Sequence, residues 1–203
     1  MKLGHALSAA LYAGAAVTVA ALGRCGQTNS PGPGHTINPL DLLPASDEVA
    51  GWIAVPNGNC PWEGIASDTT TLFDIFDGPA RPYVDNGFVN GGFRGYIDKI
   101  NSTPHDTIPL CLQLFNQGTS AKALAVFAAT GFPGLPYETV TGIGDTARID
   151  TSMTNIILEM KFKTCFVRAI VWARGPSIDA IYKQALMDFA AAVVRRITAA
   201  GAV

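Results

Sequence analysis

Alternation of apolar and polar side chains predicts β-strands along much of the chain. Residues 156–160 and 165–172 alternate on either side of a short connection, which is typical of a β-hairpin. Residues 108–115 predict another strand, and residues 88–100 predict one or two, interrupted by a pair of glycines. We expect one face of the second hairpin strand to pack against helices, and that face carries Cys165, Val167, Ala169 and Val171.

Two short helical segments are predicted between these strands and the N-terminal part of the chain. Asp68 is the expected N-cap of a helix over 69–77, which Gly78-Pro79 ends. Most side chains in its second half are apolar, so this helix must be largely buried. A second helical segment runs through Tyr83 and closes at Asn86-Gly87, a common C-terminal stop.

Two longer helices are predicted toward the C-terminus. The first begins at a cap formed by Thr119 or Ser120 and runs to Ala129. Its expected apolar stripe consists of Ala121, Leu124 and Ala128, beside Phe127. The second follows the start signal Gly175-Pro176-Ser177, and its apolar positions at helical spacing are Ile178, Ile181, Ala185, Phe189, Val193 and Ile197.

The beginning of the chain predicts an export signal. Residues 6–23 contain no charged side chain and lie between Lys2 and the pair Arg24-Cys25. A basic start followed by an apolar stretch and small residues is the pattern that the secretion machinery recognises. We therefore expect an exported protein, periplasmic or secreted, in which residues 1–25 are an address and not part of the fold.

The end of this signal leaves three outcomes open. Leu22-Gly23-Arg24-Cys25 partly fits a lipoprotein box, in which case Cys25 would carry a lipid anchor, but Arg24 is unusual directly before the cysteine. Cleavage after Ala21-Leu22-Gly23 would instead release a soluble chain that begins at Arg24. The apolar stretch also reaches the lower length limit for a spanning helix, so an uncleaved anchor is the third outcome.

Composition then predicts a tether followed by one domain. Residues 26–36 have no large apolar side chain, and we expect a flexible tether over 26–37. Residues 38–203 have the length of a single domain with one core. Without residues 1–25 the chain has 12 basic and 16 acidic side chains, a net charge of −4. Because a nucleic-acid surface needs clustered Lys and Arg, we expect no nucleic-acid partner.

Cysteine and histidine positions predict no metal site and leave the disulfide pairing open. If Cys25 carries a lipid, Cys60, Cys111 and Cys165 remain and one thiol stays free. If it does not, the four cysteines allow three pairings. The chain has no C-x-x-C motif and its three histidines are scattered, so we expect neither a bound metal nor a cofactor.

Several short sequence blocks occur in a fixed order between residues 40 and 197. They are Leu42-Leu43-Pro44, Gly51-Trp52, Leu72-Phe73-Asp74 with the residues up to Tyr83, Gly87-Phe88, the run from Leu112 to Ser120, and Ile143-Gly144-Asp145. In order and spacing these blocks resemble a family of exported bacterial proteins of unknown function. The resemblance implies a single α+β domain, with a mainly antiparallel curved sheet backed by helices and a long C-terminal helix. It brings no activity with it.

The densest of these blocks also holds the main candidate site. The family has Asn and Glu where this chain has Asp77 and Arg81, so the charge of any shared polar site would be altered here. Asp74 and Asp77 are residue types suited to acid and base catalysis or to a loosely bound hard cation. Acidic side chains near a helix start are, however, more often caps stabilised by the helix dipole, which is our default interpretation.

Three further features have a functional and a structural interpretation. Arg168 could anchor a ligand carboxylate, but we expect it to pair with Glu159 across the hairpin. The run 142–145, Gly-Ile-Gly-Asp, could cradle an anion, but it lacks the rest of a phosphate loop and predicts a tight turn. Trp62 lies in a predicted loop where it could touch a partner, whereas the other two tryptophans are expected in the core.

Two classes of function fit these observations. The first is a non-catalytic binding or structural module that meets a small molecule or an envelope partner, and meets the membrane only through the signal or a lipid on Cys25. The second is a hydrolase in which Asp74 and Asp77 act as a carboxylate pair and Arg81 clamps an anion. We favour the first, because the resemblance supplies a fold without a catalytic signature.

Overall fold

The computed structural model describes residues 37–56, 60, 63–76, 78–103, 107–131, 134–152, 154–172 and 179–201. All of them belong to one compact unit, Thr36–Val203. The predicted export signal, with Cys25, and the tether up to residue 36 lie outside the described residues. Ile37, which was assigned to the tether, packs against the core.

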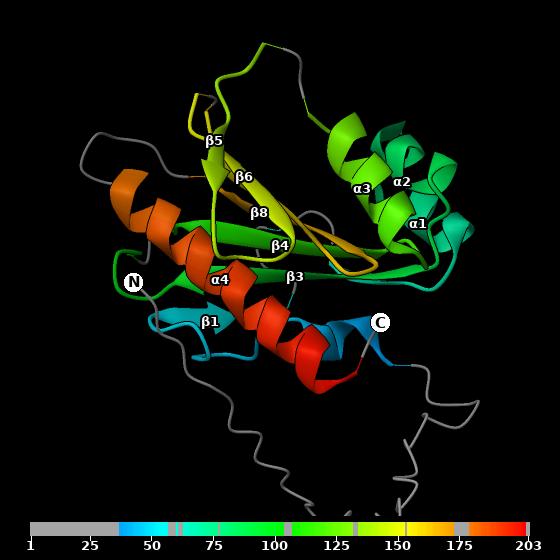
Figure 1. The fold of residues 1–203 in the computed structure, drawn as a ribbon. Helices are drawn as coiled ribbons and strands as arrows, with labels where there is room; N and C mark the ends of the chain where they lie inside the picture. The colour runs from blue at the N-terminus through cyan, green and yellow to red at the C-terminus, as the bar shows by residue number, and fades with distance from the viewer. Residues whose placement is uncertain are drawn as a thin grey trace, which may run out of the picture. The chain divides into compact units, whose positions relative to one another are not determined.

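One antiparallel sheet organises this unit (Figure 1). Within the described ranges it has eight strands: β1 (Trp52–Ala54), β2 (Gly64–Ala66), β3 (Asn90–Asp98), β4 (Pro109–Asn116), β5 (Glu138–Val140), β6 (Thr146–Asp150), β7 (Ile156–Phe162) and β8 (Cys165–Val171). Their order is β1-β3-β4-β8-β7-β6-β5. β2 pairs with the first part of β3, beyond the stretch that pairs with β1.

Helices lie on both faces of the sheet. The long helix α4 (Asp179–Ala199) crosses one face, as Figure 1 shows. The helices α1 (Thr69–Phe76), α2 (Arg81–Asp85) and α3 (Ser120–Ala129) gather over one end of the opposite face. Short 3₁₀ helices, η1 (Pro39–Leu42) and η2 (Gly78–Ala80), precede β1 and α2. The predicted α+β fold, an antiparallel sheet backed by helices with a long C-terminal helix, is confirmed.

The face beneath α4 is a mainly aliphatic core. The strands contribute alternate side chains, among them Leu110, Leu112 and Leu114 of β4 and Val167, Ala169 and Val171 of β8. The helix contributes Tyr182, Ala185, Leu186, Phe189, Ala190, Val193 and Ile197. The predicted hairpin and its helix-facing side are therefore confirmed. Ile181 is exposed instead of buried because the buried stripe of α4 is centred one residue further on. Residues 175–178 lie outside the described ranges.

The opposite face is an aromatic core. Phe76, Tyr83, Phe88, Phe93, Phe115 and Phe166 pack there with Leu72 and Val126. Phe115 lies at the centre, with the ring of Tyr83 stacked on it at 3.7 Å and the ring of Phe93 edge-on at 5.2 Å. Both faces of β8 are thus covered by helices, which explains why its apolar positions are buried on both sides.

The predicted helix caps are confirmed at two helices. The side chain of Asp68 accepts a hydrogen bond from the backbone N–H of Thr71 at 2.8 Å, before α1. Thr119 accepts one from the N–H of Lys122 at 3.3 Å, before α3. Each cap satisfies a donor that the first helical turn leaves without an internal partner.

Four further local predictions are wrong. The helix α1 is not largely buried, since only Leu72 and Phe76 are buried and Phe73 is 40 % exposed. The buried side of α3 consists of Ala123 and Val126, whereas Leu124 is 51 % exposed. Trp172, expected in the core, is 36 % exposed because it follows the last residue of β8 at the end of the sheet. The strand at 88–100 is not interrupted, since β3 runs through its paired glycines. A Cβ atom on the second of them, Gly92, would lie 2.9 Å from the backbone of Pro39, so a bare backbone lets η1 pack there.

A disulfide resolves the cysteine alternatives among the described residues. Cys60 is bonded to Cys111 on β4, with the two Cα atoms 5.1 Å apart. Cys165 is free and buried, and its burial raises the pKa of the thiol to about 11. This thiol is therefore protonated and inert at neutral pH.

Candidate functional site

The residues predicted to form a site are only partly described. Asp74 on α1 and Arg81 on α2 are both exposed. No hydrogen bond or ion pair joins these two side chains in the described part of the chain. Asp77 and Trp62, like Cys25, lie outside the described residues. The described contacts therefore do not show the predicted site, in which Asp74 and Asp77 form a carboxylate pair and Arg81 binds an anion.

Two predictions about structural roles are confirmed. Arg168 pairs with Glu159 across the β7–β8 hairpin, with 2.9 Å between Nε and Oε1. The run 142–145 forms a turn in which Asp145 accepts hydrogen bonds from Lys161 Nζ and from the backbone N–H of Lys163. The contact with Lys161 holds the pKa of Asp145 below its usual range, so this carboxylate ties the turn to β7.

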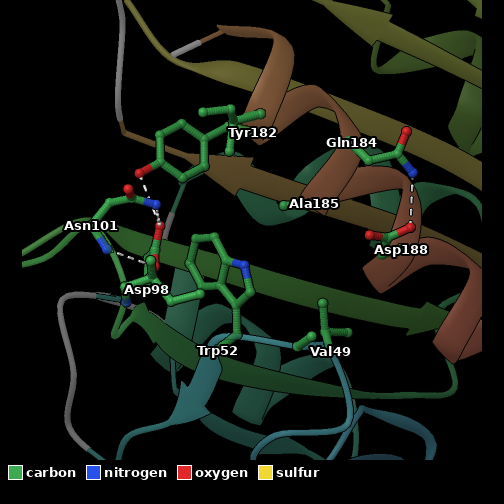
Figure 2. A pocket seen from close by; sticks show the side chains of 11 residues that line it. Val49, Trp52, Asp98, Asn101, Tyr182, Gln184, Ala185 and Asp188 are labelled. Atoms are coloured by element: carbon green, nitrogen blue, oxygen red, sulfur yellow. Dashed lines mark hydrogen bonds between the residues drawn. The ribbon is translucent and has the colours of Figure 1, made fainter.

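The structure also contains a pocket that the sequence did not predict. It lies between α4, the segment that leads into β1, and the turn after β3, and its volume is about 180 Å³ (Figure 2). Its buried residues are Val49, Trp52, Asp98, Tyr182 and Ala185. Its more exposed lining consists of Ala50, Ile100, Asn101, Ile181, Gln184 and Asp188.

The buried part of the pocket is positioned by the sheet. Trp52 of β1 lies directly opposite Asp98 of β3, so both side chains point toward α4. The indole ring packs edge-on against the rings of Tyr182 and Phe189, with centroids 6.0 and 5.6 Å away. Asp98 ends β3 because its carboxylate accepts the backbone N–H groups of Ile100 and Asn101 at 2.8 and 3.1 Å.

Hydrogen bonds fix the protonation states in this pocket. Burial alone would raise the pKa of Asp98. The hydrogen bonds that its carboxylate accepts outweigh burial and lower that pKa. The donors are the side-chain amide of Asn101 at 2.6 Å, the two backbone N–H groups and the hydroxyl of Tyr182 at 3.0 Å. Burial, and the bond to the Asp98 carboxylate, raise the pKa of Tyr182. Asp98 thus stays ionised and Tyr182 stays protonated, and the two side chains are hydrogen-bonded to each other (Figure 2). We assign them a positioning role and no acid–base role.

A second cavity, of about 250 Å³, extends the pocket along the helix. It shares Val49, Ala50 and Asp188 with the first and adds Glu48, Ala191 and Arg195. We call the two together the α4 groove. Its helical wall is a single stripe, Ile181, Gln184, Asp188, Ala191 and Arg195, which spans about 21 Å at 1.5 Å per residue.

The chemistry of the α4 groove changes along its length. At one end Ile100 and Ile181 expose large apolar side chains, at 73 % and 54 %. In the middle lies the carboxylate of Asp188, which accepts the side-chain amide of Gln184 at 2.9 Å. Arg195 is exposed at the other end, while Glu48 is bound to the neighbouring Arg196. The groove can therefore give apolar contact and hydrogen-bond acceptors to the same ligand.

Within the described ranges, no group of three or more His, Cys, Asp or Glu side chains is placed to hold a metal ion. No described helix combines the length and the apolar character needed to cross a membrane.

Comparison with known proteins adds no assignment. The sequence matches no family model, and it matches no curated protein and no solved structure.

Proposed function

We propose that the protein is an exported, non-catalytic binding module whose ligand lies in the α4 groove. The observation that carries the proposal is that two exposed apolar side chains, Ile181 on the helical wall and Ile100 on the opposite wall, lie in the same groove as the acceptor Asp188. Exposed apolar side chains that rim a concave surface are typical of binding sites. The polar groups beneath them, Asp98 and Tyr182, are already occupied by each other and serve to hold the walls in place.

The groove favours a small amphiphilic ligand. An apolar part would lie between Ile100 and Ile181, where it removes their exposed surface from water. Hydroxyl or amino groups further along the ligand would donate to the carboxylate of Asp188 and to the side-chain oxygen of Gln184. A ligand of this kind contacts both the apolar end of the groove and its hydrogen-bond acceptors, which neither a purely apolar nor a purely ionic ligand would do.

Export is supported by two independent features. The N-terminal sequence has the pattern of an export signal, and Cys60 and Cys111 form a disulfide. Disulfides persist in oxidising compartments and are rare in the cytosol. The hydrolase alternative needs Asp74, Asp77 and Arg81 to act on one substrate. Asp77 lies outside the described residues, and no described contact joins Asp74 to Arg81.

The proposal is tested with n-octyl glucoside below its micelle-forming concentration, titrated into the full chain by calorimetry. The glucose ring supplies donors and the alkyl chain supplies the apolar part. Ile181→Ser should weaken binding about tenfold, because the contact of one aliphatic side chain is lost. Leu124→Ser is the matched control, since Leu124 is an equally exposed aliphatic residue on α3.

Glucose alone and the Asp74→Asn variant complete the experiment. Glucose should bind far more weakly than the glucoside, because it lacks the alkyl chain. Asp74→Asn should bind the glucoside like the wild type. Equal affinities of Ile181→Ser and Leu124→Ser, or a loss of binding in Asp74→Asn, would contradict the proposed site.

A further inference from the structure

On the sheet face opposite to α4, four polar side chains interrupt the aromatic core. Gln113 of β4 lies opposite Arg168 of β8, Arg168 lies opposite Glu159 of β7, and Glu159 lies opposite Arg148 of β6. Residues directly opposite each other in antiparallel strands project from the same face of the sheet. We call these four side chains the polar row.

One half of the polar row is fully satisfied. Glu159 is buried, and its Oε2 accepts Arg148 Nε at 2.8 Å while its Oε1 accepts Arg168 Nε at 2.9 Å. Arg148 also donates to the backbone carbonyl of Phe127 at 2.6 Å. Its guanidinium lies 4.3 and 4.6 Å from the ring centres of Phe127 and Tyr137. These contacts fix Arg148 and Glu159 in place.

The other half carries a surplus of positive charge. Two guanidinium groups share one carboxylate, and among the described residues no second carboxylate is bonded to either arginine. The Arg168 side chain is only 21 % exposed, and the one hydrogen bond that its Nη1 makes among the described residues is to the hydroxyl of Tyr83 at 3.3 Å. Because Arg168 shares the carboxylate of Glu159 with Arg148, its weakly solvated charge is only partly balanced, which is costly.

The side chain of Gln113 is a second, independent indication that the polar row lacks a hydrogen-bonding partner at this end. It is 1 % exposed, and among the described residues neither the nitrogen nor the oxygen of its side-chain amide has a hydrogen-bond partner. Buried amides are nearly always hydrogen-bonded, so an unpartnered one calls for an explanation. The strand register places this amide beside Arg168, at the end of the row where the positive charge is least balanced.

We propose that Arg168 and Gln113 form a binding site for a compact oxyanion, of which a carboxylate group is the simplest form. The anion accepts from Nη1 of Arg168 and from Nε2 of Gln113, and it supplies the negative charge that the polar row lacks. Burial raises the pKa of Tyr83, so its hydroxyl keeps a proton that it can donate to the same anion. The exposed fraction of Arg168 leaves access for a small ion.

This site is separate from the α4 groove and does not depend on the function proposed there. The two lie on opposite faces of the sheet, and no residue of the polar row lines either cavity of the groove. Substitutions in one are therefore expected to leave the other unchanged. Failure of the glucoside experiment and failure of an anion experiment can thus be told apart.

The test uses sodium acetate as the probe and sodium chloride at equal ionic strength as the reference. Thermal unfolding of the full chain should show a saturable stabilisation by acetate beyond that by chloride. The melting temperature should rise by about 5 °C once acetate is in roughly hundredfold excess over its Kd. A melting temperature that depends on ionic strength alone would overturn the proposal.

Gln113→Met provides the decisive variant, because methionine keeps the size of the side chain without the amide. We expect this variant to fold and to lose the acetate response. Gln117→Met is its matched control, since Gln117 is equally buried and equally unpartnered but lies about 13 Å further along the strand direction. Gln117→Met should keep the full acetate response. Equal responses of the two variants would contradict the site.

Arg168→Lys gives a second measurement on the same site. Lysine keeps the charge and can still pair with Glu159, but it cannot place a second donor toward the anion. The apparent affinity for acetate should fall at least about tenfold. An unchanged affinity would show that Nη1 of Arg168 does not bind the anion.

Discussion

The two faces of the sheet differ in whether their buried polar groups have enough hydrogen-bonding or charged partners. Beneath α4 each named polar group has a nearby neutral or charged partner: Tyr96 donates to the carbonyl of Pro44 at 2.7 Å, and Tyr182 donates to Asp98. Beneath α1–α3 two arginines share one carboxylate, and the side-chain amide of Gln113 has no hydrogen-bond partner in the described part of the chain. The first face is organised as a stable support for the groove beside it. The second contains the proposed anion site inside an aromatic layer.

The largest expected effect comes from placing a charge in the aliphatic face. Val167→Asp should lower the free energy of unfolding by about 5 kcal/mol, because the new carboxylate is fully buried without a partner. Urea unfolding measures the loss. Ile65→Asp, at an exposed apolar position, should change it by less than about 0.5 kcal/mol. Similar stabilities of these two variants would mean that the side chain of Val167 is not buried beneath α4.

The polar row should respond almost as strongly. Glu159→Gln removes the buried carboxylate that two partly buried guanidinium groups share, and it should cost about 3–5 kcal/mol in urea unfolding. Glu138→Gln breaks an exposed ion pair with Lys183 and should cost less than about 1 kcal/mol. If Glu159→Gln were as mild as Glu138→Gln, the row would be solvated, and its surplus charge would need no anion.

The aromatic face should tolerate exposed changes better than buried ones. Phe76→Ala should cost about 3 kcal/mol, because it leaves a cavity beside Phe93 and Phe115. Asp74→Ala and Arg81→Ala lie on the same helices but are exposed, and each should change the unfolding free energy by under about 0.5 kcal/mol. The reverse order would indicate that these polar side chains have contacts beyond those described.

The smallest effect concerns acid stability at the pocket. The folded state lowers the pKa of Asp98 below its ordinary value of 3.8, so its contribution is complete above that value and is lost as the pH falls through the lowered one. Asp98→Asn should therefore flatten the dependence of stability on pH below about pH 4. Wild type and variant are compared by urea unfolding between pH 2 and pH 6. Parallel curves would mean that Asp98 is not stabilised in its ionised form.

Much of this fold can be predicted from sequence because its signals are local. Alternation identifies the β7–β8 hairpin and the two faces of β4, and the cap at Asp68 identifies the start of α1. The buried side of α3 could not be predicted, because alanines lie all around that helix and its apolar stripe is ambiguous. The strands β5 and β6 were also missed, since they are short and follow a turn-rich segment.

The candidate sites were harder to predict than the fold. The Arg168–Glu159 pair follows from the hairpin register, but Arg148 joins it from a strand that was not predicted. The wall of the α4 groove is visible as polar and apolar residues at helical spacing. Its opposite wall comes from residues 48–50 and 100–101, which tertiary packing alone brings to the helix.

The most direct test of the binding account is to map one ligand onto the structure. Backbone amide shifts of the ¹⁵N-labelled full chain would be followed while n-octyl glucoside is added below its micelle-forming concentration. We predict saturable shifts that cluster at Ile100, Ile181 and Asp188, with little change at Leu124. Shifts that instead cluster around Asp74 and Arg81, or no saturable shift in the α4 groove, would contradict the account.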